Sequence, residues 1–505
     1  MTDIASITDF DTLKQIALLQ DQEIAKLHCR LAELTEQLAR LEGKDPVAEL
    51  KRELAELKRQ LTEHQRKRFG KSSERRPRTK PRDNKARKKR TKFGRRCQPD
   101  LPHRDCNHKL SPDSLGCKIC GGELEPTSEV VDAGEEITVV ERRFEVVRHR
   151  RLKYRCHCKG SSVTAPGPTK LAPRSRYSLE FAIHVAIDKY RRHLPLARQV
   201  REMRTRGLLV DTQTLWDQLQ LLARHLQPCY DLIRHFILGA DVVGADETWW
   251  RLMKQDSTQK WWVWAISTHD AVFYRVDPSR SSEAARHCLG DYRGIVMCDG
   301  YVAYKTLAND RNDLTLAHCW SHARRKFFDA HKNYPDECDK VLDWLGQLFL
   351  IERKAPSPER LEGEAKTEAM ALRAKLRETE SRPIINKLKT WAHEQTGLPG
   401  SGLRKAIEYM LNHWTGLTQF LEDPMIPLHN NHMEQELRNW VVGRKNHYGS
   451  RSQRGTEVAA LFYTLIETAT LCGVDPAQYL HHAATAAIEH PGYATLPHEL
   501  ISPTP

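Results

Sequence analysis

The chain has 505 residues, more than one ordinary domain holds, and this length predicts several folded units. The formal net charge is +14, but residues 66–96 alone hold 17 Lys or Arg against two acids, so the remainder is close to neutral. No apolar run approaches the roughly 20 residues that cross a bilayer, and no signal-peptide pattern opens the chain, so we expect a cytoplasmic protein without a membrane anchor. Thirteen cysteines are therefore expected to serve as thiols or metal ligands.

Two leucine-rich segments predict coiled-coil helices over residues 1–63. Apolar residues recur at spacings of three and four from position 24 to 41, and again from 47 to 61, with charged residues between them. This heptad spacing is typical of coiled coils, and "GKDP" at 43–46 predicts a hinge between the two helices. Because short isolated helices are marginal in water, we expect this region to form a homo-oligomer or to pack on another helix.

A basic arm follows at residues 64–96. Its run "KARKKRTKFGRR" is preceded by Pro77 and Pro81 and is too polar and self-repelling to bury itself. Such arms bind nucleic acid or another polyanion by displacing condensed counterions. A solvated tail without a partner is the alternative interpretation.

Residues 97–165 are predicted to bind zinc. The pair Cys117 and Cys120, in "CKICGG", has the spacing of a zinc knuckle, with glycines that permit the tight turn. Cys156 and Cys158 offer a second pair beyond a strand-rich stretch, although only one residue separates them, so that His157 or His108 is an alternative ligand. Reduced cysteines buried for structural reasons are the competing interpretation.

Residues 174–238 show helical periodicity and contain a candidate helix-turn-helix. A first helix is expected to end at Gly207, and a second to begin after an N-cap at Asp211 or Thr212. Gln213 and Thr214 then occupy positions from which a recognition helix contacts DNA. An ordinary helical hairpin gives the same pattern.

From residue 239 to 330 the pattern changes to three short strands in a row, followed by alternating helices and strands. The order β-β-β-α-β-α-β-α is typical of a ribonuclease-H-like α/β core. It places Asp246 in the first strand and Asp299 at the end of the fourth, so that both carboxylates reach one edge of the sheet. Clustered oxygen ligands suit Mg²⁺, and two such ions about 3.5 to 4 Å apart assist displacement at phosphorus. A buried structural aspartate is the alternative for each residue taken singly.

Several motifs give the chain a close resemblance to a known family. "GADETWW", "CDGYVAY", "AHCWSHARRKFFDAH" and "LHNNHMEQELRNWVVGRKNHYGS" resemble those of the DDE transposases of the insertion-sequence 66 family, and the likeness extends over nearly the whole chain. The resemblance implies a multidomain α+β protein with a zinc-binding segment and a ribonuclease-H-like core. It also implies an all-helical insertion at 331–425, a last part of the core at 426–482, and a C-terminal tail at 483–505.

The resemblance assigns catalytic and Mg²⁺-binding roles to Asp246, Asp299 and Glu434. Glu436 is two residues further on, about 200° around a helix, and so faces away from any site that Glu434 faces. Two departures from the family stand out. His429 replaces the usual Asp before the two asparagines, and "CHC" replaces a cysteine pair two residues apart.

Basic residues beside these acids are candidates for DNA contacts. Phosphate contacts commonly use both side chains and backbone amides, which the glycine-rich stretches after residue 443 provide. The candidates are Arg444, Lys445, Arg324 and Arg325.

The resemblance implies hydrolysis at the 3′ ends of a transposon, followed by attack of the freed 3′-OH on target DNA with two Mg²⁺ or Mn²⁺ ions. Partners would be the transposon ends, the target DNA and accessory proteins of the same element. A DNA-binding regulator without catalysis and a stand-alone nuclease of the same fold are the alternatives.

Overall fold

A computed structural model of the chain describes residues 144–150, 152–155, 162–164, 167–173, 175–253, 258–395 and 400–501. The predicted coiled coil, the basic arm and most of the zinc-binding segment lie outside the described residues, as do Cys117, Cys120, Cys156 and Cys158. At the end of that segment, β1 (Lys153–Arg155) and β2 (Ser162–Thr164) pair antiparallel.

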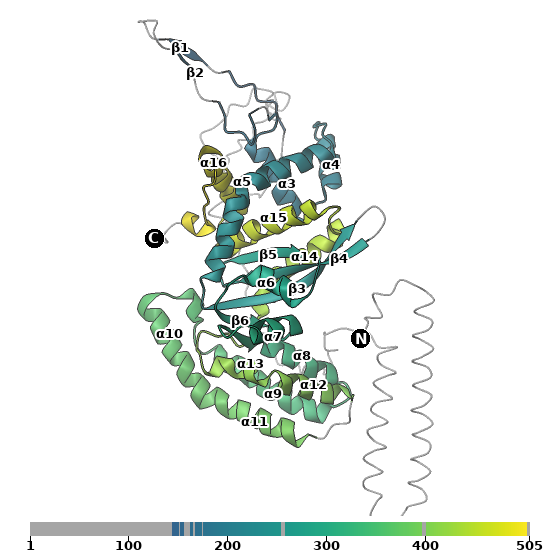
Figure 1. The fold of residues 1–505 in the computed structure, drawn as a ribbon, viewed down its shortest axis with the longest axis vertical. Coiled ribbons are helices and arrows are strands. Elements are labelled where there is room, and N and C mark those ends of the chain that lie inside the picture. Colours follow the sequence, from purple (N-terminus) through teal and green to yellow (C-terminus); the bar gives the residue numbers. More distant parts are fainter. Residues whose placement is uncertain are drawn as a thin grey trace, which may run out of the picture. The chain divides into compact units, whose positions relative to one another are not determined.

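Three helices form the region in which a helix-turn-helix is predicted (Figure 1). They are α3 (Leu179–Tyr190), α4 (Leu196–Thr205) and α5 (Thr212–Leu238). Gly207 has a φ of +83°, which suits glycine in the turn between α4 and α5. The carboxylate of Asp211 accepts a 2.7 Å hydrogen bond from the amide of Thr214, which confirms Asp211 as the N-cap of α5.

The chain then builds one mixed five-stranded sheet in the order β5-β4-β3-β6-β7. Strands β3, β4 and β5 pair antiparallel, whereas β6 pairs parallel with both β3 and β7. The predicted order of strands and helices is confirmed. The elements are β3 (Val242–Met253), β4 (Thr258–Ser267), β5 (Val272–Asp277), α6 (Ser282–Leu289), β6 (Gly294–Cys298), α7 (Val302–Asn309), β7 (Leu314–His318) and α8 (Trp320–Ala330).

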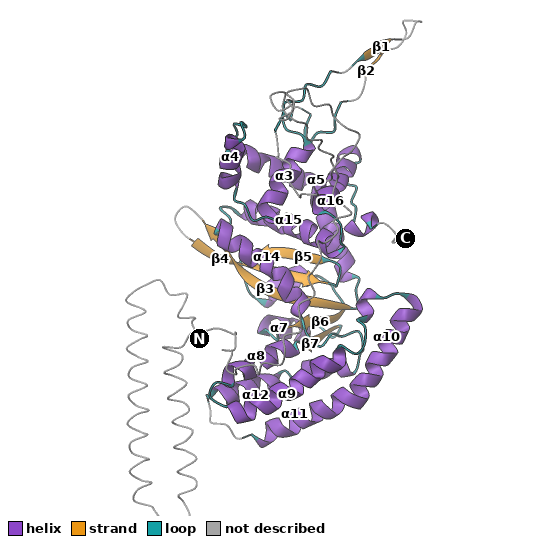
Figure 2. Ribbon diagram, turned by 180° about the vertical axis from the view of Figure 1, so that it is seen from behind, coloured by secondary structure: helices purple, strands orange, loops and turns teal. Residues whose placement is uncertain are grey.

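Later helices complete this core, and α15 runs along the β5 edge of the sheet (Figure 2). They are α14 (Asn431–His447), α15 (Gln453–Leu471) and α16 (Pro476–Glu489), followed by the short η6 (Pro497–Leu500). The hydroxyls of Thr464 and Thr468 in α15 accept hydrogen bonds from the amides of Tyr274 and Val272 in β5. Because an uncovered edge strand invites pairing with another chain, this contact protects the sheet from aggregation.

Between α8 and α14 the described chain forms helices and no strand, and it contributes most of a second hydrophobic core. It contains α9 (Pro335–Glu352), η3 (Pro358–Arg360), α10 (Gly363–Leu376), a π-helical turn η4 (Arg377–Ser381), α11 (Arg382–Glu394), α12 (Gly402–Asn412), α13 (Trp414–Thr418) and η5 (Gln419–Leu421). The buried guanidinium of Arg377 donates to Glu352 and to the carbonyls of Phe420, Asp423 and Ile426. These bonds hold in place the segment that leads from η5 into α14.

No single helix among the described residues has the length and apolarity to cross a membrane. Only α15 and α16 taken together are long and apolar enough, and the chain bends by 119° between these two helices.

Candidate active site

The sheet register brings Asp246 and Asp299 together. The last pair between the parallel strands β3 and β6 joins Gly244 to Met297. Asp246 lies two residues further along β3, and Asp299 lies two residues after Met297, directly after the end of β6. Beyond that pair the edge of β3 is no longer covered by β6, so side chains from either face of β3 can turn toward Asp299. Carboxylate oxygens of Asp246, Glu247 and Asp299 all lie within 4.8 Å of one another. The predicted pair of aspartates therefore shares one site, and Glu247 joins it.

A glycine turn holds Asp299 in place. Gly300 has a φ of +86°, and a Cβ there would lie 2.3 Å from the His413 ring, so no larger residue fits without rearrangement. The Asp299 carboxylate accepts a 2.8 Å hydrogen bond from the amide of Tyr301, and the Tyr409 hydroxyl donates to the Asp299 carbonyl at 2.5 Å. Helix α12 of the helical part thus supports a residue of the sheet.

Glu247 is the acid that the sequence did not single out. It is buried, and its carboxylate accepts hydrogen bonds from Arg280 Nε at 3.0 Å, from the Arg280 terminal nitrogen at 2.6 Å and from the Tyr304 hydroxyl at 3.0 Å. Because Arg280 neutralises it, Glu247 is less available as a ligand than Asp246. Its position next to Asp246 in "GADETWW" was the only sequence signal.

The electrostatics of the cluster favour a bound cation. Burial raises the pKa of Asp246 well above its usual value, and the charges of Glu247, Asp299 and Glu434 raise it further. Burial also raises the pKa of Glu247, with Asp299 adding to the effect. Three crowded carboxylates with oxygen as the only donor atom have the chemistry that Mg²⁺ and Mn²⁺ prefer, and a divalent ion would offset their mutual repulsion.

Helix α14 carries Glu434 and is attached to β3 by Asn430. The buried Asn430 side chain donates a 3.0 Å hydrogen bond to the carbonyl of Ala245, the residue before Asp246. A Cβ on Gly244 would lie 2.7 Å from Asn430 Oδ1, so only glycine permits this approach without a shift. The start of α14 is thereby fixed beside the aspartates.

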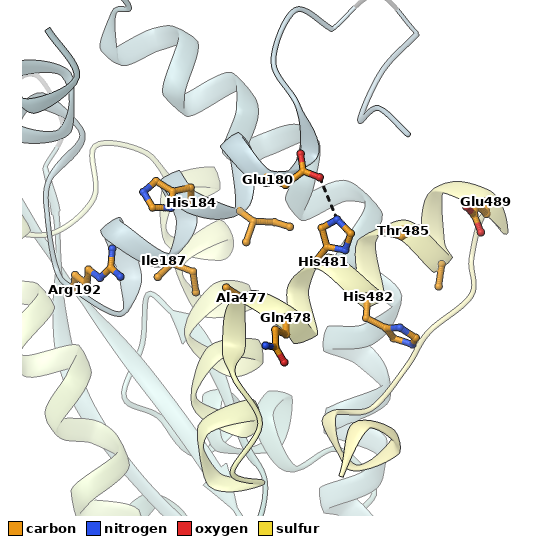
Figure 3. A pocket seen from close by; sticks show the side chains of 12 residues that line it. Glu180, His184, Ile187, Arg192, Ala477, Gln478, His481, His482, Thr485 and Glu489 are labelled. Carbon is orange, nitrogen blue, oxygen red and sulfur yellow. Dashed lines mark hydrogen bonds and ion pairs between the residues drawn. The ribbon is translucent and has the colours of Figure 1, made fainter. Parts of the chain in front are cut away.

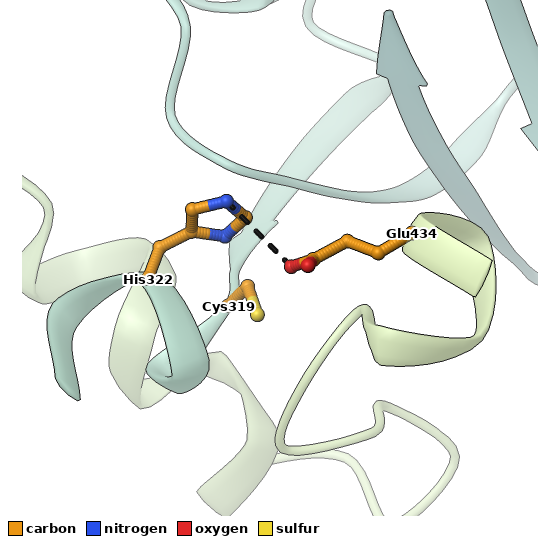
Figure 4. A group of neighbouring side chains, drawn as sticks. All are labelled: Cys319, His322 and Glu434. Atoms are coloured by element: carbon orange, nitrogen blue, oxygen red, sulfur yellow. Dashed lines mark ion pairs between the residues drawn. The ribbon is translucent and has the colours of Figure 1, made fainter. Parts of the chain in front are cut away.

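Glu434 itself contacts α8 (Figure 4). Its Oε2 accepts a 3.3 Å hydrogen bond from Arg325, and its Oε1 lies 3.7 Å from His322 Nε2. Glu434 is not part of the group of Asp246, Glu247 and Asp299 within 4.8 Å, although its charge acts on Asp246. Burial lowers the pKa of His322, against the charges of Glu434 and Asp299.

Glu436 has different surroundings from Glu434, in line with the expected rotation around the helix. Burial raises its pKa to about 7. The buried Glu467 of α15 also has a pKa raised to about 7, by burial and then by the charge of Glu436. Glu436 therefore faces α15, away from the aspartates. Whether Glu434 is the third ligand stays a prediction.

The residues predicted to contact DNA differ in their surroundings. Lys445 and Arg324 are exposed. Arg444 is half-buried, since its guanidinium carbon lies 3.7 Å from the Trp249 ring centroid and it donates to Thr248 Oγ1 and to the Trp249 carbonyl. At the start of α5, Gln213 is exposed and donates to Asp217 at 2.8 Å, and Thr214 is half-buried.

One face of the β3–β4 ribbon carries aromatic rings and cations that sequence reasoning missed. Glu247, Trp249 and Arg251 share this face because side chains alternate along a strand, and their partners on β4 are Trp264, Trp262 and Lys260. The cations lie near the rings. Lys260 is 4.8 Å and Arg280 4.7 Å from the Trp262 centroid, and Arg280 is 3.8 Å from that of Tyr301. Cations held on rings lose little further freedom on binding a phosphate.

A pocket of about 660 Å³ lies between α3 and α16, apart from this site (Figure 3). Apolar side chains that line the pocket include Ile183 and Ile187. His481 Nε2 lies 3.3 Å from the carboxylate of Glu180. None of the predicted catalytic acids lines it. The predicted catalytic acids therefore lie outside this pocket.

Comparison with known proteins identifies the family of this chain. Residues 174–458 match the Transposase IS66 family, and residues 115–159 match the zinc-finger binding domain of transposase IS66, which supports structural zinc in that segment. Three uncharacterized proteins of Sinorhizobium fredii are related. Protein y4jD is 32% identical over 74% of this chain and 74% of its own length, y4hP 29% over 74% and 71%, and y4qI 30% over 72% and 70%. From the extent of these matches, the chain belongs to the IS66 family of transposases.

Proposed function

We propose that this transposase has a ribonuclease-H-like catalytic core that cleaves DNA at transposon ends and joins the freed 3′ ends to target DNA. The observation that carries the proposal is the register of β3 and β6, which brings Asp246 and Asp299 into one cluster of oxygen ligands. Two divalent ions, Mg²⁺ or Mn²⁺, would be held by Asp246, Asp299 and Glu434. Bound there, such ions activate the attacking oxygen and stabilise the leaving one.

The protein's own residues hold these acids in place. Arg280 and Tyr304 keep Glu247 paired, so that Asp246 is the carboxylate of β3 that remains open to a ligand. The Asn430 bond to Ala245 holds the first turn of α14, and with it Glu434, near the same edge of the sheet. No serine, tyrosine or cysteine nucleophile is required, because water and then the DNA 3′-OH attack phosphorus directly.

We further propose that the aromatic and basic face of β3 and β4 contacts the DNA backbone next to the cleavage position. This face begins at Glu247 of the acid cluster and continues outward along the cross-strand pairs to Arg251 and Lys260, both exposed. DNA bound there would extend from the acid cluster along Arg251 and Lys260, whose charged groups lie near the tryptophan rings of this face. Exposed Lys445 and Arg324 are further candidates, and phosphate contacts of this kind set position and affinity without choosing sequence.

The test is Mg²⁺-dependent nicking and joining of a duplex that carries a transposon end, with Asp246→Asn and Asp299→Asn beside the unchanged protein. Each amide keeps the shape of the ligand but removes the charge that holds the ion, so both variants should bind the duplex and fail to nick it.

Other outcomes identify the alternatives. Binding without nicking by the unchanged protein indicates a DNA-binding regulator, and nicking without joining indicates a stand-alone nuclease. Nicking by Asp246→Asn at the rate of the unchanged protein would overturn the assignment of the site.

A further inference from the structure

A second group of potential metal ligands lies on the α8 side of Glu434. The Sγ of Cys319, a ring nitrogen of His322 and a carboxylate oxygen of Glu434 all lie within 4.8 Å of one another (Figure 4). Cys319 immediately precedes α8, His322 is in its first turn, and Glu434 is in the first turn of α14. The starts of two helices thus bring Glu434 to Cys319 and His322, which precede it by more than 100 residues in the chain.

Two polar atoms of this group lack hydrogen-bond partners among the described residues. Arg325 donates a hydrogen bond to Oε2 of Glu434, whereas the other oxygen, Oε1, is buried, has no hydrogen-bond partner and lies 3.7 Å from His322 Nε2. His322 Nδ1 is likewise buried without a partner. Buried polar atoms in folded proteins nearly always have a partner, so these two atoms are available to bind a ligand.

The donor atoms indicate which ligand this is. Sulfur, imidazole nitrogen and carboxylate oxygen together form a set typical of Zn²⁺, whereas Mg²⁺ takes oxygen ligands almost exclusively. The neighbouring group of Asp246, Glu247 and Asp299 has oxygen donors alone. The two groups therefore differ in the metal they select, although Glu434 influences both.

We propose that Cys319, His322 and Glu434 form a zinc site, separate from the zinc-finger segment and from the cluster of aspartates. Three protein ligands leave a fourth tetrahedral position for water. Zinc bound here keeps the Glu434 carboxylate on the α8 side and withdraws it from the aspartates. This last consequence, inhibition of cleavage by zinc, rests on the proposed function, whereas zinc binding itself does not.

The binding test measures zinc per chain in the purified full-length protein and in two variants. Cys319→Ser keeps an acceptor for the Asn430 amide, which lies 3.2 Å from the sulfur, but its hydroxyl is a poor zinc ligand. His322→Gln removes the imidazole and leaves the buried cysteine intact. Each variant should lose about one zinc per chain, the content of a single site. The zinc-finger segment is unchanged in both and contributes equally to all measurements.

Cys298→Ser is the matched control. Cys298 is also fully buried, and its sulfur lies 3.6 Å from Nδ1 of His318, but neither residue belongs to the group with a carboxylate. This variant should keep the full zinc content. If Cys319→Ser fails to fold, His322→Gln decides the question. Unchanged zinc content in a folded His322→Gln, or equal loss in the Cys298→Ser control, would overturn the site.

Cobalt gives a second readout that is independent of catalysis. Co²⁺ added to the metal-free full-length protein should produce a thiolate-to-cobalt absorption that is weaker in Cys319→Ser than in the unchanged protein. Zinc titrated into the Mg²⁺ nicking reaction tests the consequence for cleavage. If the variants lose zinc but no protein nicks DNA, the proposed function is refuted and the zinc site is supported. If the proteins nick DNA and the zinc content is the same in all of them, the zinc site is refuted and the proposed function is supported.

Discussion

The guanidinium of Arg280 donates two hydrogen bonds to one carboxylate oxygen of Glu247, at 3.0 and 2.6 Å. The other oxygen of Glu247 accepts from Tyr304. The acid cluster of this transposase therefore contains one carboxylate with its own counter-charge, beside two for which the described residues provide no ion pair. That difference separates a supporting acid from the proposed metal ligands.

Arg280→Gln should lower the free energy of unfolding by about 2 kcal/mol, because it leaves the buried Glu247 carboxylate with only one strong donor. Adding Glu247→Gln should restore part of that loss, since an amide needs no counter-charge. Denaturant unfolding of the two single variants and the double variant measures the coupling. Strict additivity would show that the pair does not stabilise the fold.

Glu434→Gln should abolish Mg²⁺-dependent nicking while DNA binding persists, and Glu436→Gln should remain active. The reason is the opposite orientation of the two carboxylates around α14, with Glu434 near Arg325 and Glu436 near Glu467. The measurement is nicking of an end-containing duplex by both variants. An active Glu434→Gln beside an inactive Glu436→Gln would place the ligand on the other side of the helix.

Gly244→Ala should reduce nicking with little effect on DNA binding, because the added methyl group would lie 2.7 Å from Asn430 Oδ1 and push the start of α14 away from Asp246. Gly346→Ala in α9 is the control, since nothing lies within 4 Å of a Cβ there and alanine favours a helix by about 1 kcal/mol. Equal nicking rates for the two variants would contradict the positioning role of Asn430.

Lys260→Gln and Arg251→Gln should each flatten the slope of log affinity for DNA against log salt by about one, as expected when one phosphate contact is lost. Lys332→Gln is the control, because Lys332 is exposed and lies two residues beyond the last residue of α8. Slopes that stay the same in both ribbon variants would mean that DNA does not follow this face of β3 and β4.

His498→Gln should lower the melting temperature at about pH 6 and have little effect at about pH 10. The hydrogen bond that His498 Nε2 donates to the Asp270 carboxylate, at 2.9 Å, raises the pKa of His498 to about 9. A raised pKa gives stability that is complete below the unfolded value near 6.5 and is lost as pH rises through about 9.

Asp270 sets the acid limit of the same contact. Burial raises its pKa, but the bonds from His498 and Thr268 outweigh burial and bring it to about 2, so its contribution is lost only as pH falls through that value. The exposed His235→Gln serves as the control for the melting curves. A His498→Gln deficit that is constant from pH 6 to pH 10 would refute the link.

Much of the core was predictable because its signals are local. Alternating short strands and the change to helical periodicity gave the order of elements, and that order placed Asp246 and Asp299 on neighbouring strands. The pairing of Glu247 with Arg280 was not predictable, because it depends on how a loop 33 residues away folds back over the sheet. The hydrogen bond from Arg444 to the Trp249 carbonyl was not predictable either, because the two residues are 195 positions apart.

The approach of Cys319 and His322 to Glu434 was hidden for the same reason. "CWSH" reads locally as the start of a basic helix, and only the packing of α8 against the chain before α14 brings it to the acid. There the amide of Trp320 donates to the carbonyl of Leu428 at 3.1 Å. Long-range pairings of this kind have no periodicity by which a single sequence reveals them.

The order in which the site's parts occur along the chain has a consequence during protein synthesis. Glu434 follows Asp299 by 135 positions, so at ribosomal rates the two aspartates precede the third acid by roughly 7 to 27 seconds. Helix α15, which covers the edge of β5, is made later still. A growing chain therefore acquires its basic arm early and its complete set of acids nearly last. We expect products truncated before α14 to occupy DNA ends without cutting them, and so to act as competitors of the intact transposase.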